Sequence, residues 1–182
     1  MNLIVDPNPN SDGYVLNTTL AKRLADRLGG ETHIIHLYDS DQRYFSYEYN
    51  EGWIDLVLSA KRLIFPTPMW NLTIPASLKD FFDKTTRRGR LWDLDGQKNY
   101  IGLLNEKSAF IIMTSGEWYP PGSPNDFVVP YLRAILSFLG IREIKDFRVG
   151  GLKDKSLTNG QSYLNEKTEE MLVSFGVKSH KL

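Results

Sequence analysis

The chain has 182 residues, of which 41% are hydrophobic and 12% aromatic, so it can bury the core of one large domain. Basic and acidic residues number 22 each, which excludes a bulk electrostatic field that would gather nucleic acid or anionic lipid. The absence of cysteine excludes disulfides, thiol nucleophiles and thiolate metal sites, and it suits a reducing cytoplasm. No basic flank or long apolar segment opens the chain, so we expect a cytoplasmic protein without a membrane partner.

Short apolar runs alternate along the chain with longer segments of helical period. This alternation predicts βαβ units that build one doubly wound parallel sheet, with residues 1–182 as a single α/β domain. In chain order we expect strand 3–5, helix 14–28, strand 32–37, loop 38–52, helix 53–60, strand 62–66, helix 75–85, strand 108–114, helix 128–139, strand 144–149 and helix 162–175. Strand 108–114 is nearly all apolar, as expected for a strand that is covered on both faces.

A ligand of such a sheet should lie beyond the carboxyl ends of the strands, where the winding reverses direction. Three predicted loops meet there, at 6–13, 67–74 and 114–126. The first leads into a helix N-terminus, whose amide groups favour a phosphate, and Asn8 and Asn17 could add neutral donors. The same residue types are also ordinary turn and cap residues, so the loop alone does not decide between the two interpretations.

The other two loops carry aromatic residues directly after buried strands. Residues 66–71, Pro-Thr-Pro-Met-Trp-Asn, combine a stiff backbone with polarizable surface, which suits a flat ring or a neighbouring part of the same domain. In the third loop Ser115 and Gly116 allow a ligand to approach the backbone closely, and Trp118 could belong to a lid. The alternative is a surface loop that buries its aromatic residues on its own domain.

Residues 68–83, beginning Pro-Met-Trp-Asn-Leu, resemble the flavin loop of the FMN-dependent NAD(P)H azoreductase and quinone reductase group of flavodoxin-like proteins. A second match begins at Thr114 and Ser115 and resumes over 124–141. The resemblance implies a flavodoxin-like fold of strand order 2-1-3-4-5 with helices on both faces. It also implies FMN as cofactor, NADH or NADPH as electron donor, and a quinone or azo compound reduced by ping-pong hydride transfer. The flavin performs this chemistry, so neither a catalytic side chain nor a metal is expected.

The resemblance also assigns residues to the cofactor. The backbone of 69–72 would hydrogen-bond the isoalloxazine, Asn71 would contact its polar edge, and Ser115 with Gly116 would border its pyrimidine side. The phosphate would lie on the first loop, where relatives typically carry serines that this chain lacks. The predicted cofactor-binding residues are Asn8, Val15, Leu16, Asn17, Pro68, Met69, Trp70, Asn71, Leu72, Ser115 and Gly116.

Two tryptophans are assigned to the substrate pocket. Trp118 follows Ser115 where relatives often carry a glycine pair, so its indole would narrow the pocket. Trp92 resembles the aromatic residue that a dimer partner lends to the flavin site in this family. We therefore expect a homodimer with two flavin sites at its interface.

Two other functions stay open. A phosphodiesterase-type hydrolase would use Ser115 as nucleophile, but His33 and His36 fall on the second strand and His180 in the tail, which leaves no evident base. A non-enzymatic flavodoxin-like binding or regulatory domain would have lost flavin binding through its phosphate loop and Trp118. Flavin occupancy separates this domain from the reductase.

Overall fold

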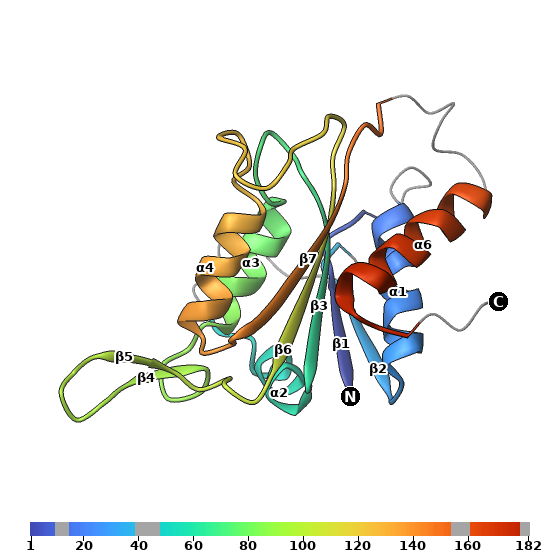
Figure 1. Ribbon diagram of the computed structural model, residues 1–182. Helices are drawn as coiled ribbons and strands as arrows, with labels where there is room; N and C mark the ends of the chain where they lie inside the picture. Colours follow the sequence, from blue (N-terminus) through green and yellow to red (C-terminus); the bar gives the residue numbers. More distant parts are fainter. Residues whose placement is uncertain (10–14, 39–47, 154–160, 179–182) are drawn as a thin grey trace.

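A five-stranded parallel sheet forms the centre of the computed structural model, which describes residues 1–9, 15–38, 48–153 and 161–178 (Figure 1). Its strands are β1 (Asn2–Asp6), β2 (Thr32–His36), β3 (Arg62–Pro68), β6 (Ser108–Thr114) and β7 (Glu143–Val149). The strand order is β2-β1-β3-β6-β7, and all neighbouring strands run parallel. The five predicted strands and their order are confirmed, and only the numbering changes, because two short strands come before β6.

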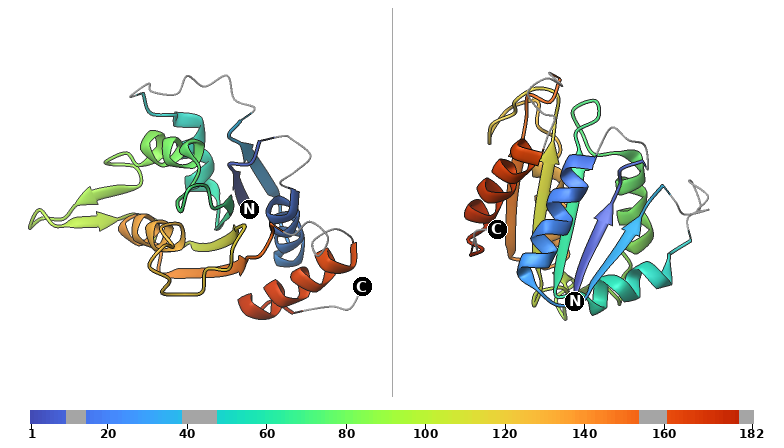
Figure 2. Two further views of the ribbon diagram at one scale, coloured as in Figure 1. Left: turned by 90° about the horizontal axis from the view of Figure 1, so that it is seen from above. Right: turned by 90° about the vertical axis from the view of Figure 1, so that its right-hand side faces the viewer.

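Helices cover both faces of the sheet (Figures 1 and 2). The helices of the described residues are α1 (Val15–Leu28), α2 (Glu51–Ser59), α3 (Ala76–Thr85), α4 (Val129–Phe138) and α6 (Gln161–Phe175). Each predicted helix is confirmed to within two residues at either end. No helix in these parts of the chain has the length and apolar character needed to cross a bilayer.

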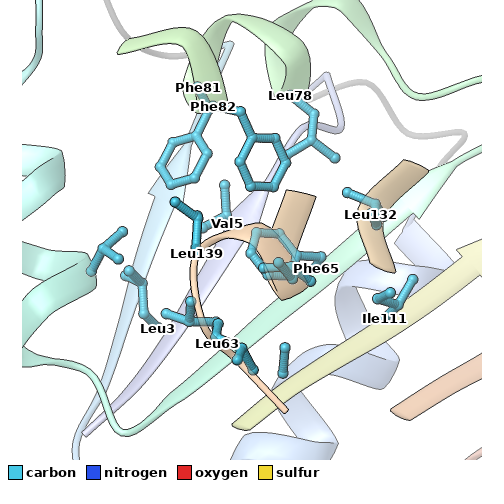
Figure 3. Close-up of a cluster of buried hydrophobic side chains, with 14 of the residues drawn as sticks. Leu3, Val5, Leu63, Phe65, Leu78, Phe81, Phe82, Ile111, Leu132 and Leu139 are labelled. Carbon is cyan, nitrogen blue, oxygen red and sulfur yellow. The ribbon is translucent and has the colours of Figure 1, made fainter. Parts of the chain in front are cut away.

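Two apolar clusters hold the layers together. On one face α1 and α6 pack through residues such as Leu24 and Phe175. On the other face α3 and α4 contribute Phe81 and Leu132, which pack with Phe65 of the sheet (Figure 3). Burial of these apolar side chains stabilises the sandwich and fixes the strand ends against one another.

A hairpin that the sequence analysis did not predict precedes β6. β4 (Trp92–Leu94) and β5 (Tyr100–Gly102) pair in antiparallel fashion and project from the end of the sheet where the strands begin (Figure 1). Strands of three residues are too short to show an alternating pattern. Gly102 lies so close to the end of α4 that a Cβ there would sit 2.1 Å from the Gly140 nitrogen, so the hairpin base needs a glycine.

β3 extends two residues beyond its predicted end at Pro66. Its pairing with β1 stops at Ile64, whereas its pairing with β6 continues to Pro68. The Pro66 carbonyl accepts a hydrogen bond from the Asn8 side chain at 3.4 Å. The backbone of Pro66 therefore faces the side of β3 where the pairing with β1 has ended. The prolines therefore lose no ladder hydrogen bond, and the strand carries them to the carboxyl edge.

Candidate functional site

Buried Asp6, Asn8 and Asn17 form a polar group with half-buried Thr18 at the start of α1, here called the α1 corner. Asp6 is 3% exposed and accepts hydrogen bonds from the backbone and side-chain nitrogens of Asn8, at 3.0 and 2.6 Å, and from the Thr18 hydroxyl at 3.0 Å. The Asn17 side chain donates to Asn8 at 3.3 Å. His36 Nδ1 lies 3.4 Å from Asp6 Oδ2 without forming a hydrogen bond. The side chains of the α1 corner thus satisfy one another.

This network bears on the predicted phosphate contacts. The Asn8 and Asn17 side chains point into the network, and Leu16 packs against the apolar cluster of α1 and α6. By helix geometry, the groups of α1 that remain for an anion are the backbone N–H groups at its start, from Val15 to Asn17, because the Thr18 N–H already donates to Asn17 Oδ1 at 3.0 Å. Residues 10–14 of the predicted phosphate loop lie outside the described residues.

Residues 70–73, here called the β3 turn, reverse the chain at the carboxyl end of β3. Trp70 and Thr73 exchange both backbone hydrogen bonds, at 2.9 and 3.1 Å. Between them Asn71 and Leu72 have φ values of 48° and 72°, in the left-handed region that disfavours residues with a Cβ. Within the described residues, the N–H groups of Asn71 and Leu72 have no hydrogen-bond partner. The turn therefore presents two amide donors on a strained backbone.

Three neighbours fix the β3 turn. The Met69 amide donates to the Thr114 carbonyl at 2.7 Å, and the Phe127 amide donates to the Leu72 carbonyl at 3.1 Å. The Trp70 ring lies edge-on to Tyr38, with 6.3 Å between the centroids. Because the amides of Met69 and Trp70 are already bonded, the segment predicted to bind the isoalloxazine retains only its last two donors. Pro68 is buried as the last residue of β3.

Ser115 and Gly116 follow β6 at the same edge. The Ser115 amide continues the ladder to the Val149 carbonyl at 2.9 Å, and its hydroxyl donates to the Glu117 carbonyl at 2.6 Å. No described histidine contacts this hydroxyl: His33 pairs with Glu31 at 2.9 Å on β2. The arrangement gives Ser115 a structural role and does not support the hydrolase alternative. His180 lies outside the described residues.

Residues 150–153, here called the β7 extension, pack against the loop after β6. A Cβ on Gly150 would lie 2.7 Å from both the Glu117 carbonyl oxygen and the Trp118 Cα, so the loop backbone touches Gly150 directly. Trp118 is nevertheless 59% exposed. One edge of the indole also packs on Gly150, with Trp118 Cε3 2.9 Å from the same Cβ position, so the ring predicted to narrow the pocket is anchored along this edge and exposed elsewhere.

A buried ion pair, which the sequence analysis missed, anchors the far end of this loop. Arg148 of β7 donates to Asp126 at 2.6 Å, and their side chains are 8% and 1% exposed. Asp126 also accepts from the amides of Val128 and Val129 at 2.9 and 3.1 Å, so it caps the start of α4. An acidic residue just before a predicted helix was the available signal for the cap. The sequence held no signal for its arginine partner.

Asp146 extends this ion pair toward the surface. It accepts hydrogen bonds from Arg148 at 3.0 Å and from Arg133 of α4 at 2.5 Å. Burial alone raises the pKa of the Asp146 carboxyl, but the hydrogen bonds and charges of the two arginines outweigh burial and lower the pKa below its usual value. The carboxylate therefore stays ionised and holds both arginines in place.

The structure brings the predicted residues together with one exception. The residues at the ends of β1, β3 and β6 meet at the carboxyl edge, whereas Trp92 lies in the β4–β5 hairpin at the opposite end (Figure 1). Its ring packs with Tyr100 and Phe138, at centroid distances of 5.4 and 5.6 Å. Trp92 therefore cannot reach the site within its own chain.

Comparisons with known proteins show the family to which the chain belongs. A family model described as flavodoxin-like fold matches residues 2–172. Over 101 residues the chain is 41% identical to an FMN-dependent NADH:quinone oxidoreductase of Nostoc sp., a match covering 53% of this chain and 48% of that protein. It is 25% identical over 156 residues to an FMN-dependent NADH:quinone oxidoreductase of Hahella chejuensis, with 85% of this chain and 71% of that protein covered. The first of these matches thus spans about half the length of the relative.

A solved structure shows the same fold. The chain superposes on an FMN-dependent NADH-azoreductase of Bacillus anthracis, solved in complex with FMN, with a TM-score of 0.74. The two sequences are 19% identical, and the match covers 96% of this chain and 97% of that one. At this identity the likeness concerns the fold.

Proposed function

Because the chain belongs to the flavodoxin-like fold family, we propose that it is an FMN-dependent NAD(P)H oxidoreductase that reduces quinones or azo compounds. The names of its relatives, which include FMN-dependent NADH:quinone oxidoreductases, support the proposal. When bound, FMN would supply the redox chemistry, a two-electron transfer from the nicotinamide nucleotide to the acceptor in two separate half-reactions. The residues of the chain bind the flavin, orient it and shield it from solvent.

The observation that carries the proposal is the β3 turn. Its two free amides, on Asn71 and Leu72, stand at the switch point beside β1, where doubly wound sheets bind their ligands. Each left-handed residue with a Cβ costs about 1–2 kcal/mol, and such strain persists where the surrounding structure enforces it, often at ligand sites. Amide donors on a fixed loop suit the carbonyl and nitrogen acceptors of a flavin ring.

Each part of the carboxyl edge then has a role. The Asn71 and Leu72 amides hold the polar edge of the ring, Met69 and Trp70 form one wall, and Ser115 with Gly116 borders the pyrimidine side. The Gly116 amide has no partner among the described residues and can serve as a further donor. The first-turn amides of α1 hold the phosphate without help from the α1 corner. Trp118 lines the acceptor space.

We also propose a single-domain, cytoplasmic homodimer. Trp92 is distant from the carboxyl edge of its own chain, so a second chain would have to deliver it. The β4–β5 hairpin supports such an interface, because Tyr100 is 68% exposed and Ile101 and Leu103 are partly exposed beside it. Exposed apolar side chains on a projecting hairpin gain free energy when a partner covers them.

The visible spectrum tests the cofactor. Purified protein is incubated with FMN, desalted, and treated anaerobically with NADH or NADPH. We expect retained flavin whose absorbance bleaches on addition of one or both nucleotides. The polar closure of the α1 corner favours a second candidate, a flavodoxin-like binding domain without flavin. Failure to retain FMN would overturn the reductase and support that domain.

The Trp118→Gly variant tests the acceptor space. Loss of the indole should change the KM for a bulky quinone or azo dye while leaving bleaching by the nucleotide intact. Trp118→Phe is the matched control, since it keeps an aromatic ring and should stay near the native KM. An unchanged KM in both variants would remove Trp118 from the acceptor space.

A further inference from the structure

A lysine and a glutamate flank Gly116 at the carboxyl edge. The Lys153 side chain lies directly over Gly116. A Cβ built on Gly116 would be 3.0 Å from Lys153 Cγ and 3.3 Å from Lys153 Cε. The Lys153 ammonium group meets Glu117 at 2.5 Å. Their side chains are 72% and 61% exposed. A cation and an anion thus stand beside the residue that borders the proposed pyrimidine side.

Backbone pairing places Lys153 there. The Leu152 amide donates to the Ser115 carbonyl at 3.2 Å, and the Lys153 amide donates to the Gly116 carbonyl at 3.4 Å. These bonds continue the contact of β6 with β7 past the end of the sheet. An exposed ion pair contributes little to stability, so stability alone gives little reason for this pair.

Arg148, a second cation among the described residues that contact this loop, is already neutralised. Arg148 is buried and bonded to both Asp126 and Asp146. Lys153 is partnered only by Glu117 among the described residues, and it is exposed enough to turn toward a bound ligand. Hydrogen bonding to Glu117 raises the pKa of Lys153, so the group carries its positive charge at neutral pH.

We propose that Lys153 contacts the pyrimidine side of bound FMN and stabilises the negative charge that the ring gains on reduction, an inference that rests on the proposed function. A hydride brings two electrons and one proton to the neutral ring, which leaves one negative charge, carried largely by the pyrimidine part. A cation beside that charge binds reduced FMN more tightly than oxidised FMN. Glu117 holds the ammonium group near Gly116 and offsets part of its field.

Two variants that break the same ion pair separate this role from a structural one. Lys153→Met leaves the Glu117 charge, whereas Glu117→Gln leaves the Lys153 charge. The readouts are the midpoint potential of protein-bound FMN, from anaerobic titration with a reference dye, and the dissociation constant of oxidised FMN. Lys79→Met is the control, because Lys79 belongs to another exposed ion pair, with Asp83 on α3.

The two variants should shift the potential in opposite directions. Lys153→Met should weaken the binding of reduced FMN about tenfold more than the binding of oxidised FMN, which lowers a two-electron potential by about 30 mV. Glu117→Gln should raise the potential, and Lys153→Arg and Lys79→Met should stay near the native value. Shifts of the same sign in the first two variants, or none, would overturn the inference. A chain that retains no FMN would instead contradict the proposed function.

Discussion

The α1 corner and the β3 turn lie on neighbouring strands of one sheet edge, yet they are built in opposite ways. At the α1 corner, polar side chains turn inward and bond to one another around Asp6. At the β3 turn, the backbone amides of two exposed left-handed residues have no partner among the described residues, and neighbouring loops hold the turn in place. The first is a relaxed and closed arrangement, whereas the second is a strained and open one.

This difference shows which groups a ligand can use. Where the side chains are satisfied internally, only the helix backbone can bind a ligand, and its contribution does not depend on the side-chain hydroxyls that the sequence lacks. Where the backbone is strained and open, contacts with neighbouring loops must hold it in place. The variants below test these contacts and the hydrogen bonds of the α1 corner separately.

The largest effect should come from the ion pair that anchors the loop after β6. Arg148→Met leaves the carboxylate of Asp126 buried without its partner, so we expect the free energy of unfolding to fall by about 3–5 kcal/mol. Urea denaturation measures this change. Arg133→Met is the control, because Arg133 is exposed and its loss should cost less than about 1 kcal/mol. Equal costs would mean that burial of the pair does not brace the loop.

Opening the α1 corner should cost less. Asp6→Ala removes the acceptor of three donors, two from buried Asn8 and one from half-buried Thr18, which should destabilise the protein by about 2–3 kcal/mol. Asp6→Asn keeps the shape and one carbonyl acceptor, so thermal or urea unfolding should show a smaller loss. If Asp6→Asn proved as costly as Asp6→Ala, the charge of Asp6 would matter more than its hydrogen bonds.

Gly150→Ala should disturb the open side of the site. The added Cβ would meet the Glu117 carbonyl and the Trp118 backbone at 2.7 Å, so the loop must move, at a cost of about 1–2 kcal/mol. The same displacement should weaken retention of FMN, which fluorescence quenching measures. Gly96→Ala is the control, since nothing lies within 4 Å of its Cβ position. Unchanged stability and FMN retention in Gly150→Ala would show that the loop yields without cost.

Leu72→Gly should raise the free energy of unfolding, whereas the preceding variants lower it. Glycine adopts the φ of 72° without strain, so the variant should gain about 0.5–1 kcal/mol of stability. Leu103→Gly is the matched control: Leu103 is also partly exposed but lies outside the left-handed region, and glycine there should destabilise by a similar amount. Urea unfolding of both variants measures the difference, and a loss in Leu72→Gly would mean that the β3 turn stores no strain at this residue.

The smallest expected effect is on the pH dependence of stability, through Asp146. The pKa of Asp146 in the folded protein lies below its usual value of 3.8, so the ionised group stabilises the fold above about pH 4, and this contribution is lost as the pH falls further. Asp146→Asn should therefore show a shallower decline of unfolding free energy in acid than the native protein. Urea titrations at several acidic pH values measure the slope, and parallel declines would contradict the assignment.

The sequence by itself determined the layers of this protein. Apolar runs such as 108–114 and the helical period of 14–28 report burial directly, because strand and helix repeats follow from local backbone geometry. The motif after β3 also placed the candidate ligand loop. The β4–β5 hairpin escaped detection, since three-residue strands carry too little pattern.

Only the tertiary structure decided which polar groups are free. Asn8 and Asn17 look like phosphate donors in the sequence, yet the packing of β1 against α1 turns them toward Asp6 and each other. Arg148 meets Asp126 across 22 residues of chain, and Lys153 crosses Gly116 because β7 pairs with β6. A hydrogen bond between distant residues depends on the register of strands, which no local pattern encodes.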